Sequence, residues 1–440
     1  MRGIFSDEAR IHGFLKAEEA LARAEGEFGV VPESLAPAIA ALNPAGFDME
    51  ELARGAMLTG VPVIPFVLAL QNMLPPDLRG HVHRGATTQD IADTGLVLQM
   101  RDAFALLEKG LLELLEPLEA LARRYARTPC AGRTYGQHAA PVTFGFKAAV
   151  WLSGITNAAS ALPQMKTKVL LASLGGPVGT LASLGDNGPA IAESYAQYLE
   201  LRNAPISWHT DRTPITMTGA WLALILGAMA KMAGDIIQLA ATEVGEVSEP
   251  YESGRGGSSA MPHKRNPVSS AVIVAAHEAA LGHVTTLFSA MRAAQERPAG
   301  QWHAEWHSLP QLFGLASGAL EQAISLAKGL QICPERMLRN LNETKGLLFA
   351  EAVAATLAPK LGRQKAHSLI EEAAAEVRDT GMPLEDVLAN EPFASSTKDC
   401  PIADAFSLQP HINAAAHWVE SAAAASRSVR AILISNPEKQ

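Results

Sequence analysis

The sequence predicts an all-α protein whose largest part is a bundle of long helices. From Thr88 to about Arg127, apolar residues recur at intervals of three and four positions, over a stretch far longer than an ordinary globular helix. Four other alanine- and leucine-rich segments show the same spacing, at about Pro141 to Leu162, Thr216 to Val244, Pro267 to Ala294 and Trp306 to Leu326. With 48% hydrophobic and 18% charged residues, the 440-residue chain is able to bury a large core. We therefore expect a central five-helix bundle within residues 88–345.

A smaller helical domain is expected before the bundle, in residues 1–87. Ser6 and Asp7 are suited to cap a helix whose apolar positions fall mostly on one face and which ends within residues 26–29. A second helix is expected over residues 49–58.

The rest of the chain shows more turns. Pro117 is expected to kink or split the first long helix, because proline lacks the backbone N–H and its ring clashes with the preceding turn. Residues 169–184 combine turn-forming glycines with flanking apolar runs, which favours a small hairpin. After Gly346 the turns come at short intervals, so we expect residues 346–440 to form a third, smaller domain of shorter helices.

Composition limits the kind of partner and the compartment. The net charge is −9 and there is no long basic run, so a nucleic-acid partner has little support. The cysteines, Cys130, Cys333 and Cys400, are far apart and odd in number, which fits a reducing cytoplasm better than a disulfide framework or a four-cysteine metal site. The first residues lack the apolar core of a signal peptide, and runs such as Ala220 to Ala230 are too short to span a bilayer. We expect no export or membrane segment.

Residues 253–270 hold the densest group of residues suited to chemistry. Gly256 to Ala260 are small residues that give the backbone wide conformational freedom, and they lead to the cationic Lys264. Asn266 is a good N-cap and Pro267 suits the first helical position, so a helix is expected to start at Asn266. Its free N–H groups would form a site for an anion such as a carboxylate. A solvated linker between two helices is the alternative interpretation.

The order of residues in this loop, Gly257-Ser258-Ser259-x-Met261-Pro262-x-Lys264-x-Asn266-Pro267, resembles the signature loop of the fumarase/aspartase superfamily, here residues 253–267. It is most similar to the branch of adenylosuccinate lyases and 3-carboxy-cis,cis-muconate cycloisomerases. The resemblance implies a fumarase/aspartase-like fold of three helical domains around a long five-helix bundle. It also implies that Ser258 is the general base, that Lys264 is catalytic, and that Met261 and Asn266 bind substrate. A serine hydroxyl loses its proton only where cations and oriented N–H groups stabilise the oxyanion.

Partners and cofactors also follow from the resemblance. It implies a homotetramer whose active sites are shared between subunits, because the polar regions lie on segments that a single bundle would hold far apart. The implied substrate is a small di- or tricarboxylate. No cofactor, metal, nucleic acid or membrane is expected.

Residues 80–90 place hydroxyls, an amide, imidazoles and a cation at the start of the first long helix. Taken alone, they are an N-cap with a capping pattern. The segment resembles the first signature region of the superfamily, Thr-Ser-x-Asp, whose polar groups bind substrate carboxylates. By that resemblance His83, Thr87, Thr88 and Gln89 are binding candidates.

Residues 133–145 resemble the second region, Arg-Thr-His-Gly-Gln-x-Ala-x-Pro, but depart from it at one functional position. Tyr135 stands where those lyases carry the histidine that acts as general acid, and Ala271 stands where its glutamate partner is expected. Gln137 is a binding candidate. His138 is another, and faces the same way as Tyr135 if the turn is helical; a buried structural histidine is the alternative.

The missing acid has a chemical interpretation. A carboxylate, with a conjugate-acid pKa of about 4, leaves without a proton donor, whereas an amine or hydroxide does not. Opening 4-carboxymuconolactone by β-elimination expels such a carboxylate. In the biological direction the muconate carboxylate adds to its own double bond, and Ser258 protonates the adjacent carbon. We therefore expect the cycloisomerase reaction of the protocatechuate and β-ketoadipate route of aromatic degradation.

Three alternatives to the cycloisomerase remain. An adenylosuccinate lyase-like enzyme is less favoured, because residues 59–66 are apolar where those lyases carry an Arg-His-Asp element. Another β-elimination lyase acting on a substituted succinate stays open. A non-catalytic helical scaffold is the alternative of a different class.

Residues 296–307 form the last polar cluster. His303 and His307 lie four positions apart, a spacing suited to two metal ligands on one helix face. No third ligand is near in sequence, and a similar Trp-His-Ala-Glu-Trp run occurs in the cycloisomerases, so a structural or substrate-lining role is preferred for this run and its Glu305. Arg297 is a carboxylate-binding candidate, with an ion pair as the alternative.

Overall fold

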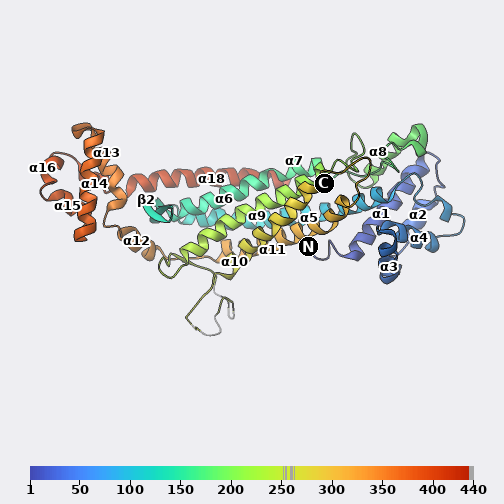
Figure 1. Ribbon diagram of the computed structural model, residues 1–440, viewed down its shortest axis with the longest axis horizontal. Helices are drawn as coiled ribbons and strands as arrows, with labels where there is room; N and C mark the ends of the chain where they lie inside the picture. The colour runs from blue at the N-terminus through green and yellow to red at the C-terminus, as the bar shows by residue number, and fades with distance from the viewer. Residues whose placement is uncertain (251, 253–254, 258–260, 262, 436–440) are drawn as a thin grey trace. The chain divides into compact units, whose positions relative to one another are not determined.

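The computed structural model describes residues 1–250, 252, 255–257, 261 and 263–435. Helices dominate this part of the chain, as predicted (Figure 1). The α-helices are α1 (Asp7–Glu27), α2 (Leu35–Ala40), α3 (Met49–Thr59), α4 (Val63–Met73), α5 (Thr88–Arg124), α6 (Phe144–Ser160), α7 (Leu162–Val169), α8 (Gly188–Tyr198), α9 (Thr213–Leu239), α10 (Val268–Ala290), α11 (Gln301–Gly329), α12 (Pro334–Asn342), α13 (Ala350–Leu361), α14 (Arg363–Thr380), α15 (Leu384–Ala389), α16 (Ala394–Thr397), α17 (Ile402–Ala405) and α18 (Gln409–Ser435). The 3-10 helices are η1 (Pro44–Gly46), η2 (Arg79–His81), η3 (Ala182–Asn187) and η4 (Leu347–Phe349), and the strands are β1 (Pro129–Thr134), β2 (Gln137–Thr143), β3 (Val247–Ser248) and β4 (Gln331–Ile332).

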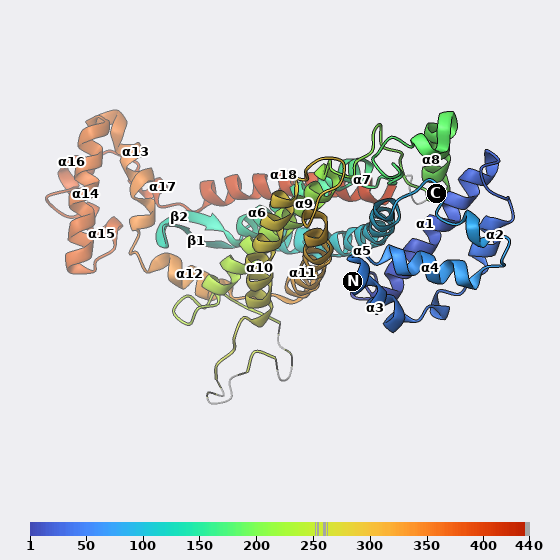
Figure 2. The ribbon, with the colours of Figure 1, turned by 45° about the vertical axis from the view of Figure 1, so that its right-hand side comes forward.

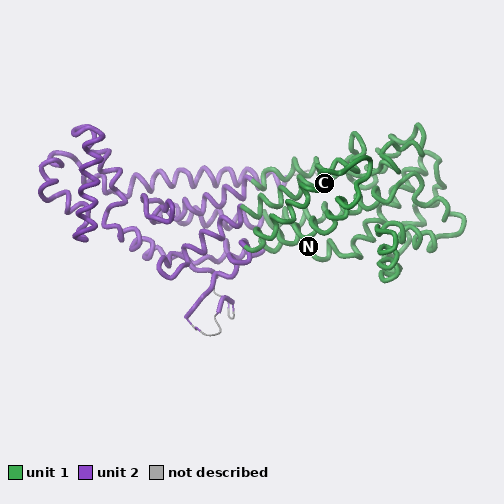
Figure 3. The backbone as a smooth tube through the Cα atoms, viewed as in Figure 1, with its two compact units in different colours: residues 1–111, 158–227, 275–320 green, residues 112–157, 228–274, 321–440 purple. Residues whose placement is uncertain are grey.

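The five predicted bundle helices are confirmed as α5, α6, α9, α10 and α11. Pro117 lies inside α5, which continues to Arg124, so Pro117 does not split the helix, and the alternative of a kink stays a prediction. The chain divides into two compact units, with unit 1 formed by residues 1–111, 158–227 and 275–320 and unit 2 by the rest (Figure 3). The boundary between the units falls inside all five helices. The division into domains after residues 87 and 345 stays a prediction.

Unit 1 has an aromatic core between its long helices. The ring of Phe104 on α5 packs edge-on against Trp221 of α9, with centroids 5.8 Å apart, and against Phe313 of α11 at 5.3 Å. Gly219 lets α9 approach its neighbours, since a Cβ there would lie 2.3 Å from Leu287 Cδ1 of α10. Helices this close need glycine at the contact, because even the methyl group of alanine would clash.

The N-terminal helices of unit 1 follow the sequence closely. Ser6 caps α1 by accepting a hydrogen bond from Ala9 N at 3.2 Å, and α1 and α3 match the helices predicted for these residues. Phe14 of α1 packs edge-on against Phe66 of α4, which also stacks on Phe47. Burial of these rings supplies the apolar area that holds the short helices together.

Unit 2 contains the hairpin β1–β2, which Figure 2 shows beside α12. Its strands pair from Pro129↔Thr143 to Thr134↔Gln137, with a bulge after Gly132. The hairpin predicted within residues 169–184 is wrong. That segment ends α7, forms an isolated bridge from Leu171 to Arg202 and then enters η3, so its glycines serve loop turns rather than a strand pair.

The C-terminal part of unit 2 corrects a second prediction. Residues 346–440 were expected to hold only shorter helices, yet α18 has 27 residues. Arg427 of α18 donates to Glu119 of α5 at 2.6 Å, and Arg123 of α5 donates to Glu420 of α18 at 3.0 Å. The segment from η4 to α16 has a core of its own, formed by Phe349, Val353, Leu357, Ala366, Ile370, Ala373, Val377, Leu384, Val387, Leu388 and Phe393.

Two of the bundle helices are more apolar than expected. By length and composition alone, α9 and α10 are long and apolar enough to cross a membrane, which the shorter apolar runs in the sequence did not indicate. Core helices of soluble bundles have the same length and composition. In the most apolar window of α10 only 22% of the residues are buried, against 44% for α9, which leaves α10 with an apolar outer face.

Candidate active site

The first polar region, residues 80–90, leads into the start of α5 in unit 1. Thr87 precedes the helix, and its backbone N–H donates to Asp90 Oδ2 at 2.9 Å, which satisfies one of the free donors at the helix start. The capping interpretation of this segment therefore holds. Thr88 is the first residue of α5 and is half-buried.

Arg297 comes next to this region from the segment before α11. Its Nη2 donates to Thr87 Oγ1 at 2.7 Å and to the carbonyl of Pro177 at 3.1 Å. The structure thus brings together two residues that the sequence suggested separately, 210 positions apart. Both of these contacts are to neutral oxygens, so the positive charge of Arg297 is available to an anion.

Gln89 has a different environment from its neighbours. Its side chain is fully buried, and Nε2 donates to Asp93 Oδ2 at 3.1 Å and to the His209 carbonyl at 2.8 Å. A group enclosed in this way stabilises the interior of unit 1. The binding role of Gln89 stays a prediction.

A buried polar network that the sequence did not suggest lies behind this region. Asp90 accepts hydrogen bonds from Gly175 N, Gly176 N and His209 Nε2, at 2.8, 2.9 and 2.6 Å. These contacts fix the loop after α7 to the start of α5. In the sequence, Asp90 is visible only as an acidic residue at the third position of a predicted helix. Its partners could not be predicted, because they come from distant segments.

A second buried network joins α5 to α11. The guanidinium of Arg212 donates to Asp93 at 2.8 Å and to Glu305 at 2.6 Å, and all three side chains are at most 1% exposed. Trp302 Nε1 also donates to Asp93, at 2.9 Å. Burial raises the pKa of the Glu305 carboxyl even though Arg212 opposes that change. Glu305 is therefore a structural residue, one of the two roles preferred for its run.

The two histidines of the last polar cluster have separate neighbours. His303 Nε2 lies 3.2 Å from the Gly60 carbonyl, and His307 packs against the ring of His283 at 5.5 Å. No group of three or more histidine, cysteine, aspartate or glutamate side chains suited to hold a metal occurs among the described residues.

His83 lies at the edge of the first region. Its Nδ1 is 2.6 Å from Oε1 of Glu18 on α1, and its backbone has φ 61°, a left-handed conformation that non-glycine residues rarely adopt. Burial disfavours the charged ring, but the Glu18 carboxylate outweighs burial and raises the pKa of His83. A charged, oriented imidazole at this position is suited to bind a carboxylate.

The second polar region forms the tip of the β1–β2 hairpin. Tyr135 and Gly136, with φ 51° and 77°, make a two-residue turn in which both residues are left-handed, as hairpin turns require. The turn is therefore not helical, and the expected alignment of His138 with Tyr135 over a helical turn is wrong. Tyr135 is fully exposed, and Gln137 beside it is also exposed.

His138 pairs with Arg133 across the hairpin and is half-buried. Burial and the nearby guanidinium of Arg133 lower the pKa of His138 below its ordinary value. The neutral imidazole is therefore the main form at neutral pH, and it is suited to a hydrogen bond rather than to an ion pair.

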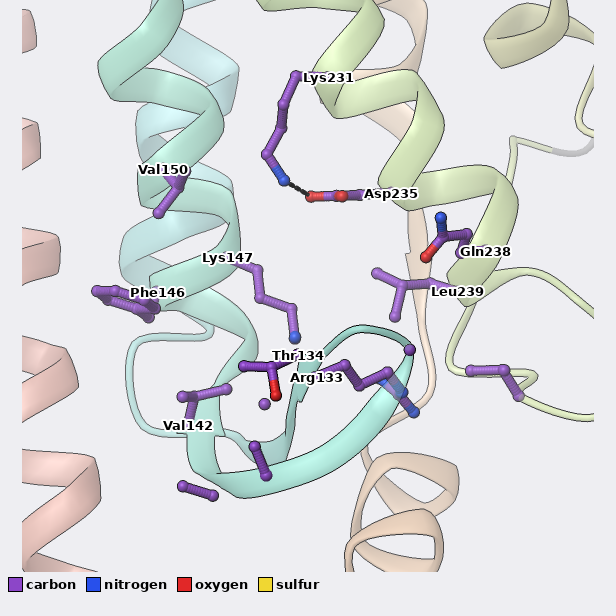
Figure 4. Close-up of a pocket in the computed structure, with 15 residues that line it drawn as sticks. Arg133, Thr134, Val142, Phe146, Lys147, Val150, Lys231, Asp235, Gln238 and Leu239 are labelled. Carbon is purple, nitrogen blue, oxygen red and sulfur yellow. Dashed lines mark hydrogen bonds and ion pairs between the residues drawn. The ribbon is translucent and has the colours of Figure 1, made fainter.

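A cavity of about 520 Å³ lies in unit 2 between the hairpin, α6 and the last turns of α9 (Figure 4). Its polar lining residues are Arg133, Thr134, Lys147, Lys231, Asp235 and Gln238, and its larger apolar ones are Val142, Phe146, Val150, Leu239 and Val244. A cavity with a mixed lining of this kind is suited to a small organic anion.

Two of the three cationic side chains that line this cavity are paired with carboxylates. Arg133 donates to both oxygens of the buried Glu246, at 3.1 and 2.5 Å, and Lys231 is paired with Asp235. Lys147 has no carboxylate partner among the described residues, and Figure 4 shows its side chain directed toward Thr134. Lys147 was not predicted as a site residue, because in the sequence it is a lone cation in the apolar first turn of α6.

The signature loop lies only partly within the described residues. Ser258 falls outside them. Met261 and Lys264 are exposed, Asn266 is half-buried, and Lys264 N donates to the Met261 carbonyl at 3.1 Å. The side chain of Lys264 is therefore open to a ligand.

The helix after this loop begins at Val268, not at Asn266, and its first N–H groups are already occupied. The Glu249 carboxylate accepts hydrogen bonds from Ser269 N at 2.9 Å and from Ser270 N at 2.8 Å. The prediction that these N–H groups bind a ligand carboxylate is therefore wrong, because a side-chain carboxylate of the same chain fills that place.

Comparisons with known proteins agree with this arrangement. A family model described as Lyase matches residues 1–282, and one described as Adenylosuccinate lyase C-terminus matches residues 346–422. The 3-carboxy-cis,cis-muconate cycloisomerase of Pseudomonas aeruginosa is 44% identical over 96% of this chain and 94% of its own. The nitrosuccinate lyase of Streptomyces davaonensis is 43% identical over 88% of this chain and 84% of its own.

A solved structure of a related protein has the same fold as this chain. The 3-carboxy-cis,cis-muconate lactonizing enzyme from Pseudomonas putida has a TM-score of 0.90 and 40% sequence identity, and the match covers 98% of this chain and 97% of the other.

Proposed function

The chain belongs to the lyase superfamily of fumarase and aspartase, and we propose that it is a 3-carboxy-cis,cis-muconate cycloisomerase. The observation that carries this proposal within the superfamily is the lost proton donor. Tyr135 lies at an exposed hairpin tip, at the position where other members of the superfamily carry the histidine that acts as general acid. Ala271 stands at the position of the glutamate that pairs with that histidine. The relatives that bear the cycloisomerase name, at up to 44% identity, support the same assignment.

The proposed reaction needs one proton transfer and one ring closure. A carboxylate oxygen of 3-carboxy-cis,cis-muconate forms the bond to a carbon of its own double bond, and the electron pair of that double bond moves to the adjacent carbon. Ser258 delivers a proton to that carbon, which gives 4-carboxymuconolactone. In reverse, the departing group is a carboxylate, and it needs no acid.

The three carboxylates of this substrate call for several cationic partners. Lys264 is proposed to stabilise the aci-carboxylate that forms when the carbon beside a carboxylate gains negative charge, with Asn266 and Met261 beside it. Arg297 and His83 are proposed partners of another carboxylate, together with Thr87 and Thr88. The exposure of Lys264 and the free charge of Arg297 support these roles.

The cavity beside the hairpin is the proposed place of the third carboxylate. Lys147 supplies its uncompensated positive charge, and Gln137 and His138 are the proposed hydrogen-bonding groups nearby. The apolar walls of the cavity suit the carbon skeleton of the muconate.

We further propose a cytoplasmic homotetramer with active sites shared between subunits. The apolar outer face of α10, with Val272, Leu281 and Phe288 each at least 45% exposed, supports contact with another copy of the chain. The apolar character of α9 and α10 then has an explanation that needs no membrane.

One relative supports a second candidate. The similarity to a protein named nitrosuccinate lyase, at 43% identity, favours β-elimination of another good leaving group from a substituted succinate. The lost acid fits that reaction as well, because both reactions share a leaving group that departs as a stable anion.

A substrate panel tests the assignment. The purified protein is mixed separately with 3-carboxy-cis,cis-muconate, nitrosuccinate, adenylosuccinate, argininosuccinate, and fumarate plus ammonia, and ultraviolet absorbance is followed. We expect kcat/KM for the muconate to exceed the others by at least ~100-fold. Faster turnover of nitrosuccinate would favour the second candidate, and preference for adenylosuccinate or argininosuccinate would contradict both.

A further inference from the structure

Glu18 is a buried carboxylate that the proposed reaction does not use. It lies on α1, is 1% exposed, and its Oε1 is 2.6 Å from Nδ1 of His83, which is 65 residues away in sequence. A buried carboxylate is costly unless it is paired, so this contact is a strong constraint on the position of the imidazole.

The geometry gives the two ring nitrogens of His83 different tasks. Nδ1 points inward to Glu18, and the side chain keeps 18% of its surface exposed. Nε2 has no hydrogen-bond partner among the residues that the structure describes. The left-handed backbone at His83 and the buried Val82 before it hold the residue in place.

The charged groups around His83 come from several elements. Glu25 lies on the same face of α1 as Glu18, Asp90 is on α5, and Tyr195 is on α8, while Arg84 follows His83 and donates to the Val30 carbonyl at 3.0 Å. Asp90 is held by its own four donors, and Tyr195 carries no charge at neutral pH because burial raises the pKa of its hydroxyl. Glu18 is thus the carboxylate in direct contact with the ring.

We propose that Glu18 is a positioning residue for substrate recognition: it holds His83 by Nδ1, so that Nε2 presents a fixed, charged N–H donor to a carboxylate of the substrate. This inference rests on the proposed function for the identity of the ligand. The contact between the two side chains and its effect on the imidazole do not depend on it. A carboxylate behind an imidazole fixes both the orientation of the ring and the nitrogen that carries the free proton.

The first test uses no substrate. Diethyl pyrocarbonate acylates neutral imidazole, so a charged His83 is protected, and the modified histidines are identified by peptide mass mapping at pH 7. We expect His83 to be modified about tenfold faster, relative to the exposed His367, in Glu18→Gln than in the wild type. His209, which is 2% exposed, reports whether the variant is still folded. Equal relative modification of His83 in both proteins, with His209 protected, overturns the proposal.

The second test measures KM and kcat for 3-carboxy-cis,cis-muconate at pH 6 and pH 8. A hydrogen bond to a charged group is worth roughly 10- to 100-fold in affinity, so Glu18→Gln should raise KM by that factor at pH 8 and change kcat less. Part of the loss should be regained at pH 6, where the imidazole is protonated again. In a His83→Gln background, Glu18→Gln should add no further change.

Glu19→Gln is the matched control, because Glu19 is the next residue on α1 and pairs with Arg23 at 2.7 Å. It should leave KM unchanged at both pH values. A loss in Glu18→Gln of equal size at pH 6 and pH 8 would show a merely structural role and contradict the proposal. If the wild type does not use the muconate, the proposed function fails, and the modification test still decides the role of Glu18.

Discussion

Glu25, two turns after Glu18 on α1, is 1% exposed, and its Oε1 has no hydrogen-bond partner among the described residues. Burial, followed by repulsion from Glu18, raises the pKa of Glu25 from 4.5 to about 8. Between these two pH values the folded chain holds a proton that the unfolded chain releases. The contribution of this proton to the free energy of unfolding is greatest below about pH 4.5 and is lost as the pH rises through about 8.

Glu25→Gln should remove this dependence on pH. The amide has the shape of the protonated carboxyl group and does not titrate, so the variant should match the wild type in stability near pH 5 and exceed it above pH 8. Thermal midpoints measured from pH 5 to pH 9 check this, with Glu19→Gln as the control. A wild-type midpoint that changes with pH in the same way as that of Glu25→Gln would contradict the buried proton.

Individual site residues were predictable from the sequence where they belong to a short recognisable motif. Thr87 and Arg297 were both named from local patterns, and the structure places them in contact. The groups that support the site were not predictable in this way. Glu18 and His83 are 65 positions apart, and Asp90 and His209 are 119 apart, so only the folded chain shows that they meet.

At the scale of elements, α5 and α11 are joined by the buried ions Asp93, Arg212 and Glu305. Removing the cation leaves two buried carboxylates without compensation, which costs about 3–5 kcal/mol. Arg212→Met should therefore lower the free energy of unfolding by that amount in a urea titration.

The control for this prediction is Arg54→Met. Arg54 pairs with Glu50 at 3.7 Å, and both side chains are at least 66% exposed, so its loss should change the free energy of unfolding by at most ~0.5 kcal/mol. Equal stability of Arg212→Met and the wild type would show that the three ions do not hold the helices together.

Helix periodicity predicted the long elements well and the turns poorly. The five bundle helices were found because leucine and alanine recur on one face over many turns. Helix α18 was missed because alanine and serine are its commonest residues and its apolar pattern is weak. Its ion pairs with α5 cannot be read from the sequence. The true hairpin was missed because Tyr135, an unusual residue for a left-handed turn position, precedes Gly136.

At the scale of the whole molecule, the proposed tetramer makes α10 an interface. Phe288 is 54% exposed, and a charge placed there would be buried without a partner if another copy packs against it. Phe288→Glu should therefore yield smaller, inactive species in sedimentation velocity. Gln364→Glu, which adds the same charge on the exposed surface of α14, should leave assembly unchanged.

Complementation tests whether the active sites are shared. Inactive Ser258→Ala chains mixed with inactive Thr87→Ala chains should regain activity, because some sites then receive both native residues from different subunits. A fully active monomer, or no recovery after subunit exchange is shown by mass spectrometry, would contradict shared sites.

We propose that this enzyme transfers a proton through Ser258 and needs no acid where other members of the superfamily carry a histidine. The most direct measurement is kcat for 3-carboxy-cis,cis-muconate in Ser258→Ala and in Tyr135→Phe. Ser258→Ala should lose at least ~100-fold in kcat while still binding substrate, because it removes the proton-transfer group. Tyr135→Phe should stay within about threefold of the wild type, since an exposed phenol has no proton to supply to a departing carboxylate. A loss in Tyr135→Phe as large as that in Ser258→Ala, with binding intact, would make Tyr135 the acid and contradict the account.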